Sequence, residues 1–155
     1  MKKTVLLALV LLSLIAVVPQ PASAARFGLG LLVGDPTGLS WKLWATRRTA
    51  LDGCLGWSFG DHGFTRVHVD YLWHSPIRTD GGRLWFHYGL GGAMWLGHRS
   101  RHADDLGLGV RGVLGLEYQF RRSPFGIFGE AAPTMNVTPV GWFDMQGGAG
   151  FRLYF

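Results

Sequence analysis

Apolar and polar residues alternate with a period of two along most of the chain beyond residue 25. The last residues show the pattern clearly, because Phe151, Leu153 and Phe155 alternate with Arg152 and Tyr154. Such alternation predicts β-strands with one apolar face and one polar face. Eight segments carry it, and we therefore predict eight strands, at about residues 26–33, 39–45, 51–59, 65–73, 83–96, 106–121, 125–134 and 146–155.

The charged residues at the centre of these segments, with Asp144 just before the last one, fall on one face of the strands. They are Lys42, Asp52, Arg66, Asp70, His87, Arg111, Glu117, Glu130, Asp144 and Arg152. A water-soluble barrel turns its apolar face inward, whereas here the apolar face suits lipid, where a lysine or arginine would cost about 2–4 kcal/mol at the midplane. We predict an all-β fold, an eight-stranded antiparallel transmembrane up-and-down β-barrel whose lumen holds the charges.

The first residues form a different kind of segment. Lys2 and Lys3 precede an apolar run over residues 5–18, and the small residues Ala22-Ser23-Ala24 follow. This order is typical of a cleaved secretory signal peptide. A retained membrane helix is the alternative, but the run is shorter than the roughly 20 residues that a span needs. We predict a signal peptide over residues 1–24, export through the Sec pathway and a barrel domain over residues 25–155.

Composition excludes several other classes of protein. The chain has 24 glycines, which disfavour a helical bundle because glycine costs about 1 kcal/mol inside a helix. The single cysteine, Cys54, excludes an internal disulfide, and a packed lumen would use it as a small filler. The net charge of +5 is mild and scattered along the chain. We therefore expect no nucleic-acid partner.

An even number of strands places both chain termini on one side of the membrane, which we predict to be the periplasm. The turns on the outer side of the membrane are then predicted at about residues 34–37, 60–63, 97–105 and 135–141. Gly38 is predicted to adopt the left-handed backbone conformation that ends the first of these turns. A periplasmic connection is predicted over residues 74–82, and Pro133 at a bulge or strand end. Outward aromatic residues would form two girdles, one of Phe27, Tyr71, Trp73, Phe86, Tyr118, Phe120 and Phe155, the other of Trp57, Phe59 and Phe143.

The lumen of an eight-stranded barrel is about wide enough for its own side chains. The inward charges therefore predict a packed ion network in which acids neutralise arginines, because an unpaired buried charge is costly. His68 and Asp70 share a strand face and are expected to join it. The alternative is that Arg111, Glu117, Glu130 and Arg152 line a narrow ion path or a small-ligand pocket, for which the inward glycines would leave space.

A catalytic alternative rests on His98-Arg99-Ser100. Lipid A 3-O-deacylases are similar to this chain in size and use a His-x-Ser pair with an acid, and His98 would act as general base for Ser100 with Asp104 or Asp105 nearby. These residues fall in a polar turn, so we expect a solvated loop. Contact of its charges with lipopolysaccharide phosphates is the alternative. His98 and His102 have a spacing that needs a helix to converge on a metal. We therefore expect no catalytic residues, no metal and no cofactor.

The whole of residues 25–155 resembles a family of small eight-stranded outer-membrane β-barrel proteins, known as outer membrane protein beta-barrel domains or domains of unknown function. The similar segments are Phe27-Gly28-Leu29-Gly30, Gly34-Asp35-Pro36-Thr37-Gly38-Leu39, Asp70-Tyr71-Leu72-Trp73-His74-Ser75-Pro76, Leu106-Gly107-Leu108-Gly109-Val110-Arg111-Gly112, Gly129-Glu130-Ala131-Ala132-Pro133 and Gly147-Gly148-Ala149-Gly150-Phe151-Arg152. The resemblance implies the transmembrane barrel and no activity.

These observations together predict an integral outer-membrane protein of Gram-negative bacteria with a structural or interaction role. The terminal aromatic residue, Phe155, is similar to the signal that the barrel assembly machinery reads on such proteins. The expected partners are outer-membrane lipids, lipopolysaccharide and that machinery, and the barrel is expected to be a monomer. A lipid A-modifying enzyme and a narrow pore or small-ligand binder remain the alternatives.

Overall fold

The computed structural model describes residues 26–57, 64–98, 104–138 and 141–155. The strands are β1 (Phe27–Asp35), β2 (Thr37–Trp44), β3 (Thr49–Trp57), β4 (Phe64–Ile77), β5 (Gly82–His98), β6 (Asp104–Phe120), β7 (Phe125–Thr138) and β8 (Trp142–Tyr154). Within this described part of the chain, no helix is long and apolar enough to cross a membrane. The predicted signal peptide over residues 1–24 lies outside the described residues.

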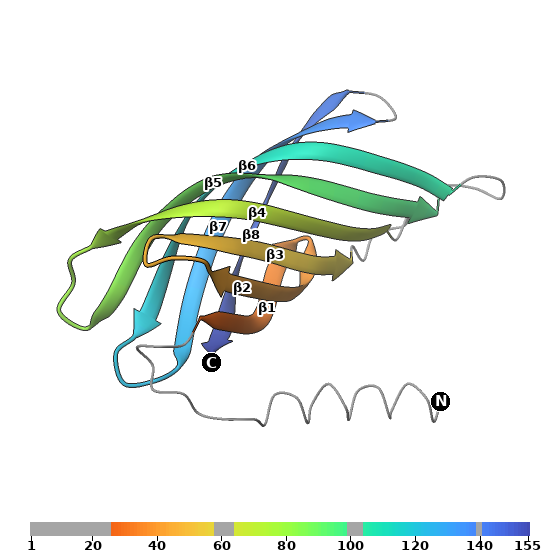
Figure 1. The fold of residues 1–155 in the computed structure, drawn as a ribbon. Coiled ribbons are helices and arrows are strands. Elements are labelled where there is room, and N and C mark those ends of the chain that lie inside the picture. The colour runs from red at the N-terminus through yellow and green to blue at the C-terminus, as the bar shows by residue number, and fades with distance from the viewer. Residues whose placement is uncertain (1–25, 58–63, 99–103, 139–140) are drawn as a thin grey trace, which may run out of the picture.

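The strands form one closed barrel in sequence order, each antiparallel to the next (Figure 1). β8 returns to β1, where Leu31 pairs with Phe151 and Gly28 with Tyr154. Closure gives every strand two neighbours, so no strand edge is left unpaired. The predicted fold class, an all-β eight-stranded antiparallel up-and-down barrel, is confirmed.

The barrel wall is not equally tall all around, because the strands differ in length. β1 and β2 have 9 and 8 residues, whereas β5 and β6 have 17 each. In Figure 1 the start of β1, the end of β8 and the connections 45–48, 78–81 and 121–124 lie at one end, which we call the terminal end. β5 and β6 extend well beyond the β1–β2 hairpin at the other end (Figure 1). The taller wall therefore rises on the side away from the closing pair of strands.

Several strands are longer than the sequence pattern predicts. β4 continues to Ile77 into the predicted connection 74–82, and β5, β6 and β7 reach His98, Asp104 and Thr138. The polar residues of these extensions favour loops, but antiparallel pairing continues through them, as in the pair His98–Asp104. Gly38 is also a strand residue that pairs with Leu32 and Gly56, so its predicted place at a left-handed corner is wrong.

Pro133 lies inside β7 and pairs with Met145, so its predicted position at a bulge or strand end is wrong. The register between β6 and β7 is the same on both sides of it. The pairing shift in these two strands occurs at Leu108 and Gly109, close to the end of β7. Pro133 has no N–H to donate, and the exposed outer face of the barrel tolerates its ring at this position.

The outer and inner faces have opposite character. Outward side chains such as Leu90 and Val110 are 62% and 58% exposed. Inward side chains such as Lys42, Asp70 and Arg111 are 2% exposed or less. An apolar exterior around a charged interior is the reverse of the arrangement in a water-soluble barrel. The alternation along each strand produces this arrangement directly, because successive side chains point to opposite faces.

Candidate functional site: the charged lumen

A line of charged residues runs across the inner face along the direction of the interstrand hydrogen bonds. Lys42 pairs with Asp52, which in turn pairs with Asp70. Gly91 lies next to Asp70 on β5, and Arg111 follows on β6. Neighbouring strands are about 4.7–4.9 Å apart, so cations and acids on this line are brought within ion-pair distance by the sheet itself. A Cβ at Gly91 would meet the carboxylate of Asp70, so the glycine makes room for that side chain.

Glu117 binds several side chains in the part of the lumen nearer the terminal end. It is 1% exposed. The Lys42 Nζ donates to Glu117 Oε2 at 2.5 Å, and Arg152 Nη1 lies 3.8 Å from the same oxygen. Its other oxygen, Oε1, accepts from the Tyr154 hydroxyl and from Gln119 Nε2 at 2.8 Å. Both oxygens of one buried carboxylate are therefore used, as a buried charge requires.

Arg152 connects the last strand to the first ones. Its guanidinium donates to the Ser40 hydroxyl at 2.6 and 3.0 Å and to Asp52 Oδ1 at 2.8 Å. The face of the Phe128 ring lies 3.7 Å from the guanidinium carbon. A cation over an aromatic face is stabilised by the ring quadrupole, more so when water is excluded. This contact brings β2, β3, β7 and β8 together across the lumen.

Arg111 forms a second centre, farther from the terminal end. Its Nε lies 3.3 Å from Asp70 Oδ1, and its Nη2 donates to Glu130 Oε1 at 3.3 Å. Nη1 donates to Gln146 Oε1 at 3.2 Å, and Gln146 Nε2 donates on to Asp144 at 3.3 Å. The guanidinium on β6 therefore contacts side chains of its neighbour β7 and of β4 and β8, the strands two away on either side.

The remaining predicted lumen charges lie beyond these two centres. Arg66 Nη1 and Nη2 are 3.6 and 3.7 Å from Asp35 and Asp144, and its guanidinium lies 6.0 Å from the Trp95 ring. His68 Nε2 is 3.8 Å from Asp70 Oδ2. Asp35 is about half exposed while Arg66 is buried. The ion network therefore reaches solvent at this pair, which lies away from the terminal end.

Cys54 lies in the same interior, 1% exposed, in a small apolar cluster with Leu32 and Phe128. It is the one cysteine of the chain. We expect a polar maleimide to leave it unmodified in the folded barrel and to add a single label after unfolding by boiling in dodecyl sulfate, as measured by intact mass. A Thr46→Cys variant, with its thiol at an exposed turn, serves as the reactive control; equal labelling of folded wild type and variant would contradict the packed lumen.

His74 and His87 face each other inside the barrel near the terminal end. They are paired residues of β4 and β5, their ring centroids are 5.5 Å apart, and both are buried. The Trp44 ring lies 4.4 Å from that of His74, and the Trp85 ring lies 6.2 Å from it. A Cβ at Gly115 would collide with His87 Nε2. The glycine therefore provides the space that the His87 ring fills.

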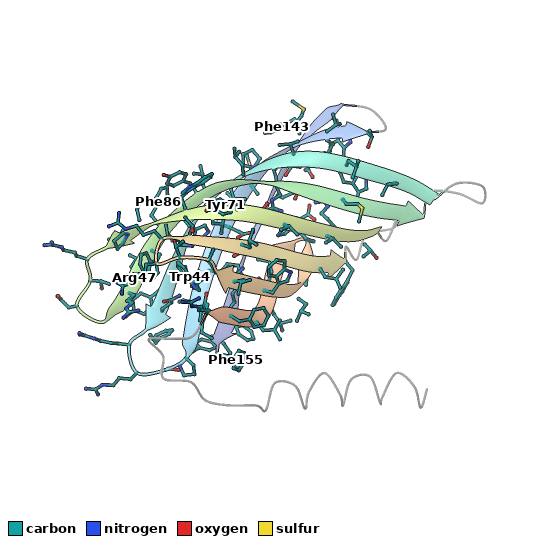
Figure 2. All side chains as sticks on the ribbon, in the orientation of Figure 1. Trp44, Arg47, Tyr71, Phe86, Phe143 and Phe155 are labelled. Carbon is teal, nitrogen blue, oxygen red and sulfur yellow. The ribbon has the colours of Figure 1, made fainter. Side chains whose placement is uncertain are left out.

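The terminal end itself is strongly basic. Its seven exposed arginines are Arg26, Arg47, Arg48, Arg78, Arg83, Arg121 and Arg122. Asp80 is the single acid in the described turns 45–48, 78–81 and 121–124. A pocket of about 1350 Å³ opens among these turns and is lined deeper in by Trp44, Trp85 and Tyr154. Arg47 and Trp44 lie at this end in Figure 2, as does Phe155, whereas Phe143 lies at the other.

The outward aromatic residues gather as the sequence predicts. Phe27, Tyr71, Trp73, Phe86 and Phe120 are 38–40% exposed, and the rings of Tyr71 and Trp73 are in edge-to-face contact. Trp57 and Phe143 are 44% and 61% exposed; Phe59 lies outside the described residues. Phe155 is tied to β1 by two backbone hydrogen bonds with Phe27, of 2.8 and 3.3 Å. The last residue therefore belongs to the closing seam of the barrel.

The candidate catalytic residues are not brought into a described site. His98 is the last residue of β5, opposite Asp104 at the start of β6, and nothing is described of either side chain. Ser100 and His102 lie outside the described residues. The predicted loop 97–105 is shorter than expected, because strand pairing extends to His98 and Asp104.

Sequence reasoning did not predict several lumen residues as partners. Ser40, Phe128, Gln146 and Tyr154 all bind members of the network. Each is at an inward position of its strand, so period-2 reasoning alone could have found them. His74 was assigned to a connection because Pro76 follows it, yet it continues the inward face after Leu72.

The fold and interior define a class: a closed eight-stranded β-barrel with an apolar exterior and an ion-paired lumen. The chain is similar in structure to the N-terminal β-barrel domain of Pseudomonas aeruginosa OprF, with a TM-score of 0.60 and 17% sequence identity over 83% of this chain and 95% of that chain. At this identity the likeness concerns the fold. No protein-family model and no curated protein sequence matches the chain. The resemblance inferred from the sequence is therefore supported for the barrel architecture only.

Proposed function

We propose that the protein is an integral outer-membrane β-barrel with a structural or interaction role, whose lumen is a filled ion network rather than a channel. The observation that carries this proposal is the inversion of polarity, with exposed leucine, valine and aromatic side chains outside and ion-paired Lys42, Arg111 and Arg152 inside. Such an exterior is stable in lipid and unfavourable in water.

The filled lumen argues against conduction. Across the lumen, Glu117 on β6 pairs with Lys42 on β2 and Arg152 on β8 pairs with Asp52 on β3, and the Phe128 ring packs on Arg152. Eight strands leave an interior about wide enough for side chains alone. We also propose a non-catalytic role, which the ion-paired charges of the described lumen support.

The arginines at the terminal end suit a membrane surface. We place this end at the periplasmic side, where the guanidinium groups would meet the phosphates of anionic lipid headgroups and the girdle of Phe27, Trp73 and Phe86 would lie at the interface. The barrel would then interact through its ends, with lipids and lipopolysaccharide as partners. Its closing strand, ending in Phe155, would be the segment that the assembly machinery binds.

Planar-bilayer recording tests the filled lumen. We expect purified, folded protein to insert without discrete current steps above the bare-bilayer level, because the ion network blocks the lumen. Folding is verified beforehand by a gel on which the unboiled barrel migrates differently from the boiled chain, and location by fractionation of the producing cells. Regular single-channel steps from wild-type protein would overturn the proposal in favour of a pore.

A further inference from the structure

Two buried histidines near the terminal end have nitrogen atoms without partners. His74 and His87 are 3% and 1% exposed, and neither Nδ1 nor Nε2 of either ring has a hydrogen-bond partner among the described residues. A neutral imidazole has one N–H and one lone pair to satisfy. Leaving such groups buried and unpaired costs free energy. Because the two rings face each other, one nitrogen of each is available to a ligand that lies between them.

A carboxylate completes the cluster. Glu117 on β6, itself 1% exposed, offers an oxygen within 4.8 Å of a nitrogen of each histidine, and the two nitrogens also lie within 4.8 Å of each other. The three residues come from three consecutive strands, β4, β5 and β6. Their positions are fixed by barrel pairing: His74 lies opposite His87, and Glu117 lies opposite Trp85, two residues along β5.

We propose that His74, His87 and Glu117 form a binding site for one divalent transition-metal ion, of the borderline class that includes Zn²⁺ and Cu²⁺. Two imidazole nitrogens and one carboxylate oxygen are a set that these ions accept, with a fourth position left for water. Calcium and magnesium, which prefer oxygen ligands alone, are disfavoured. Bonds of about 2.0–2.1 Å to one ion hold its ligand atoms at most about 4.2 Å apart, and the three ligand atoms here lie within 4.8 Å of one another.

Lys42 opposes the metal. Its Nζ donates to Glu117 Oε2 at 2.5 Å and lies 3.7 Å from Asp52 Oδ2. An ammonium beside a divalent cation raises the energy of the loaded site, and it occupies a lone pair that the metal would use. Asp52 offers the lysine a second carboxylate when Glu117 turns to the metal. The affinity of the site for the metal therefore depends on the competition between the Lys42 ammonium and the metal ion for the Glu117 carboxylate.

The ion reaches the site from the terminal end. The pocket there is lined by Trp44 and Trp85, whose rings contact His74. Arg26, Arg47 and Arg83 lie at its mouth and repel a free cation. Salt screens such exposed charges, so we expect the rate of Cu²⁺ binding to rise with ionic strength while the site itself remains the same.

The test uses the folded full-length barrel in detergent, with CuCl₂ and ZnCl₂ as probes. We expect Cu²⁺ to quench part of the tryptophan fluorescence with a saturable 1:1 curve, because Trp44 and Trp85 lie beside His74. Zn²⁺ should displace it. His74→Gln and His87→Gln are each expected to weaken the saturable phase by at least about 100-fold, since loss of an outer-shell partner alone costs 10–100-fold.

Matched controls separate this site from adventitious binding. His68→Gln removes another buried lumen histidine, 1% exposed, that is not part of the cluster, and should leave the curve unchanged. His98→Gln combined with His102→Gln removes the histidines near the β5–β6 connection and should also have no effect. Loss of the saturable phase in this double variant, with retention in the His74 and His87 variants, would overturn the proposal.

Two further measurements keep the proposal falsifiable if a histidine variant does not fold. The zinc X-ray absorption spectrum of the wild-type protein should show two imidazole ligands, and a spectrum without imidazole scattering would exclude the site. Lys42→Met should raise the Zn²⁺ affinity by more than about tenfold, because it removes a like charge next to the ion. Unchanged or weaker binding in folded Lys42→Met would also count against it. None of these outcomes bears on the proposed barrel role.

Discussion

Glu117→Ala is expected to lower the free energy of unfolding by about 3–5 kcal/mol, because it leaves buried cations without their carboxylate. Among the described acids, Lys42 would keep Asp52, at 3.7 Å, and the Tyr154 hydroxyl would lose Glu117 as its acceptor. Arg152 retains its contacts with Ser40 and Asp52, so Lys42 loses more electrostatic stabilisation than Arg152 does. The measurement is the urea midpoint of the barrel refolded in lipid vesicles, followed by tryptophan fluorescence and by the shift on unboiled gels.

Asp35→Ala is the matched control for that variant. Asp35 also pairs with a buried cation, Arg66, at 3.6 Å, but its carboxylate is about half exposed. A solvated pair contributes at most about 1 kcal/mol, and Arg66 keeps Asp144 at 3.7 Å. Equal urea midpoints for Glu117→Ala and wild type would show that the lumen charges are solvated, and would contradict the packed interior on which the proposed function depends.

Leu90→Arg is expected to lower the free energy of unfolding in lipid by about 2–4 kcal/mol, the cost of an arginine that faces lipid at the midplane. Leu90 is at the centre of β5 and is 62% exposed on the outer face. Ile77→Arg is the control, since Ile77 is outward and 43% exposed but lies at the terminal end beside Arg78, where the cost falls to about 0–1 kcal/mol.

The comparison of these two arginine variants uses the same urea titration in vesicles. A difference of the expected size locates the apolar band at mid-barrel. If the two variants unfold at the same urea concentration, the outer face does not contact lipid. The membrane assignment would then be wrong although the barrel fold would stand.

The alternation of side chains made the strands and the inside-out polarity predictable from sequence. Lys42, Asp70 and Arg152 could be assigned to the lumen because an inward position follows from counting by twos. What each charge binds was not predictable. Arg152 meets Ser40 and Asp52, which precede it by 112 and 100 residues, and such contacts depend on the register of every strand between them.

Strand ends were the least predictable feature. His98, Asp104 and Thr138 are polar residues close to turns, and local composition favours a loop there. Pairing with a neighbouring strand overrides that preference, since each added pair satisfies backbone groups that would otherwise need water. His74 was missed for the same reason. Its side chain continues the inward face of β4, yet the proline two residues later pointed to the end of the strand.

The contacts of Arg152 also bear on how the barrel is assembled. Its partners on β2 and β3 belong to the first strands made, and its own strand is the last. Until the seam between β1 and β8 closes, the nascent sheet carries an arginine and two acids, Asp52 and Glu117, whose charges are not fully neutralised. A partly rolled sheet is therefore penalised in lipid, and closure of the seam and neutralisation of the lumen should occur as one cooperative step.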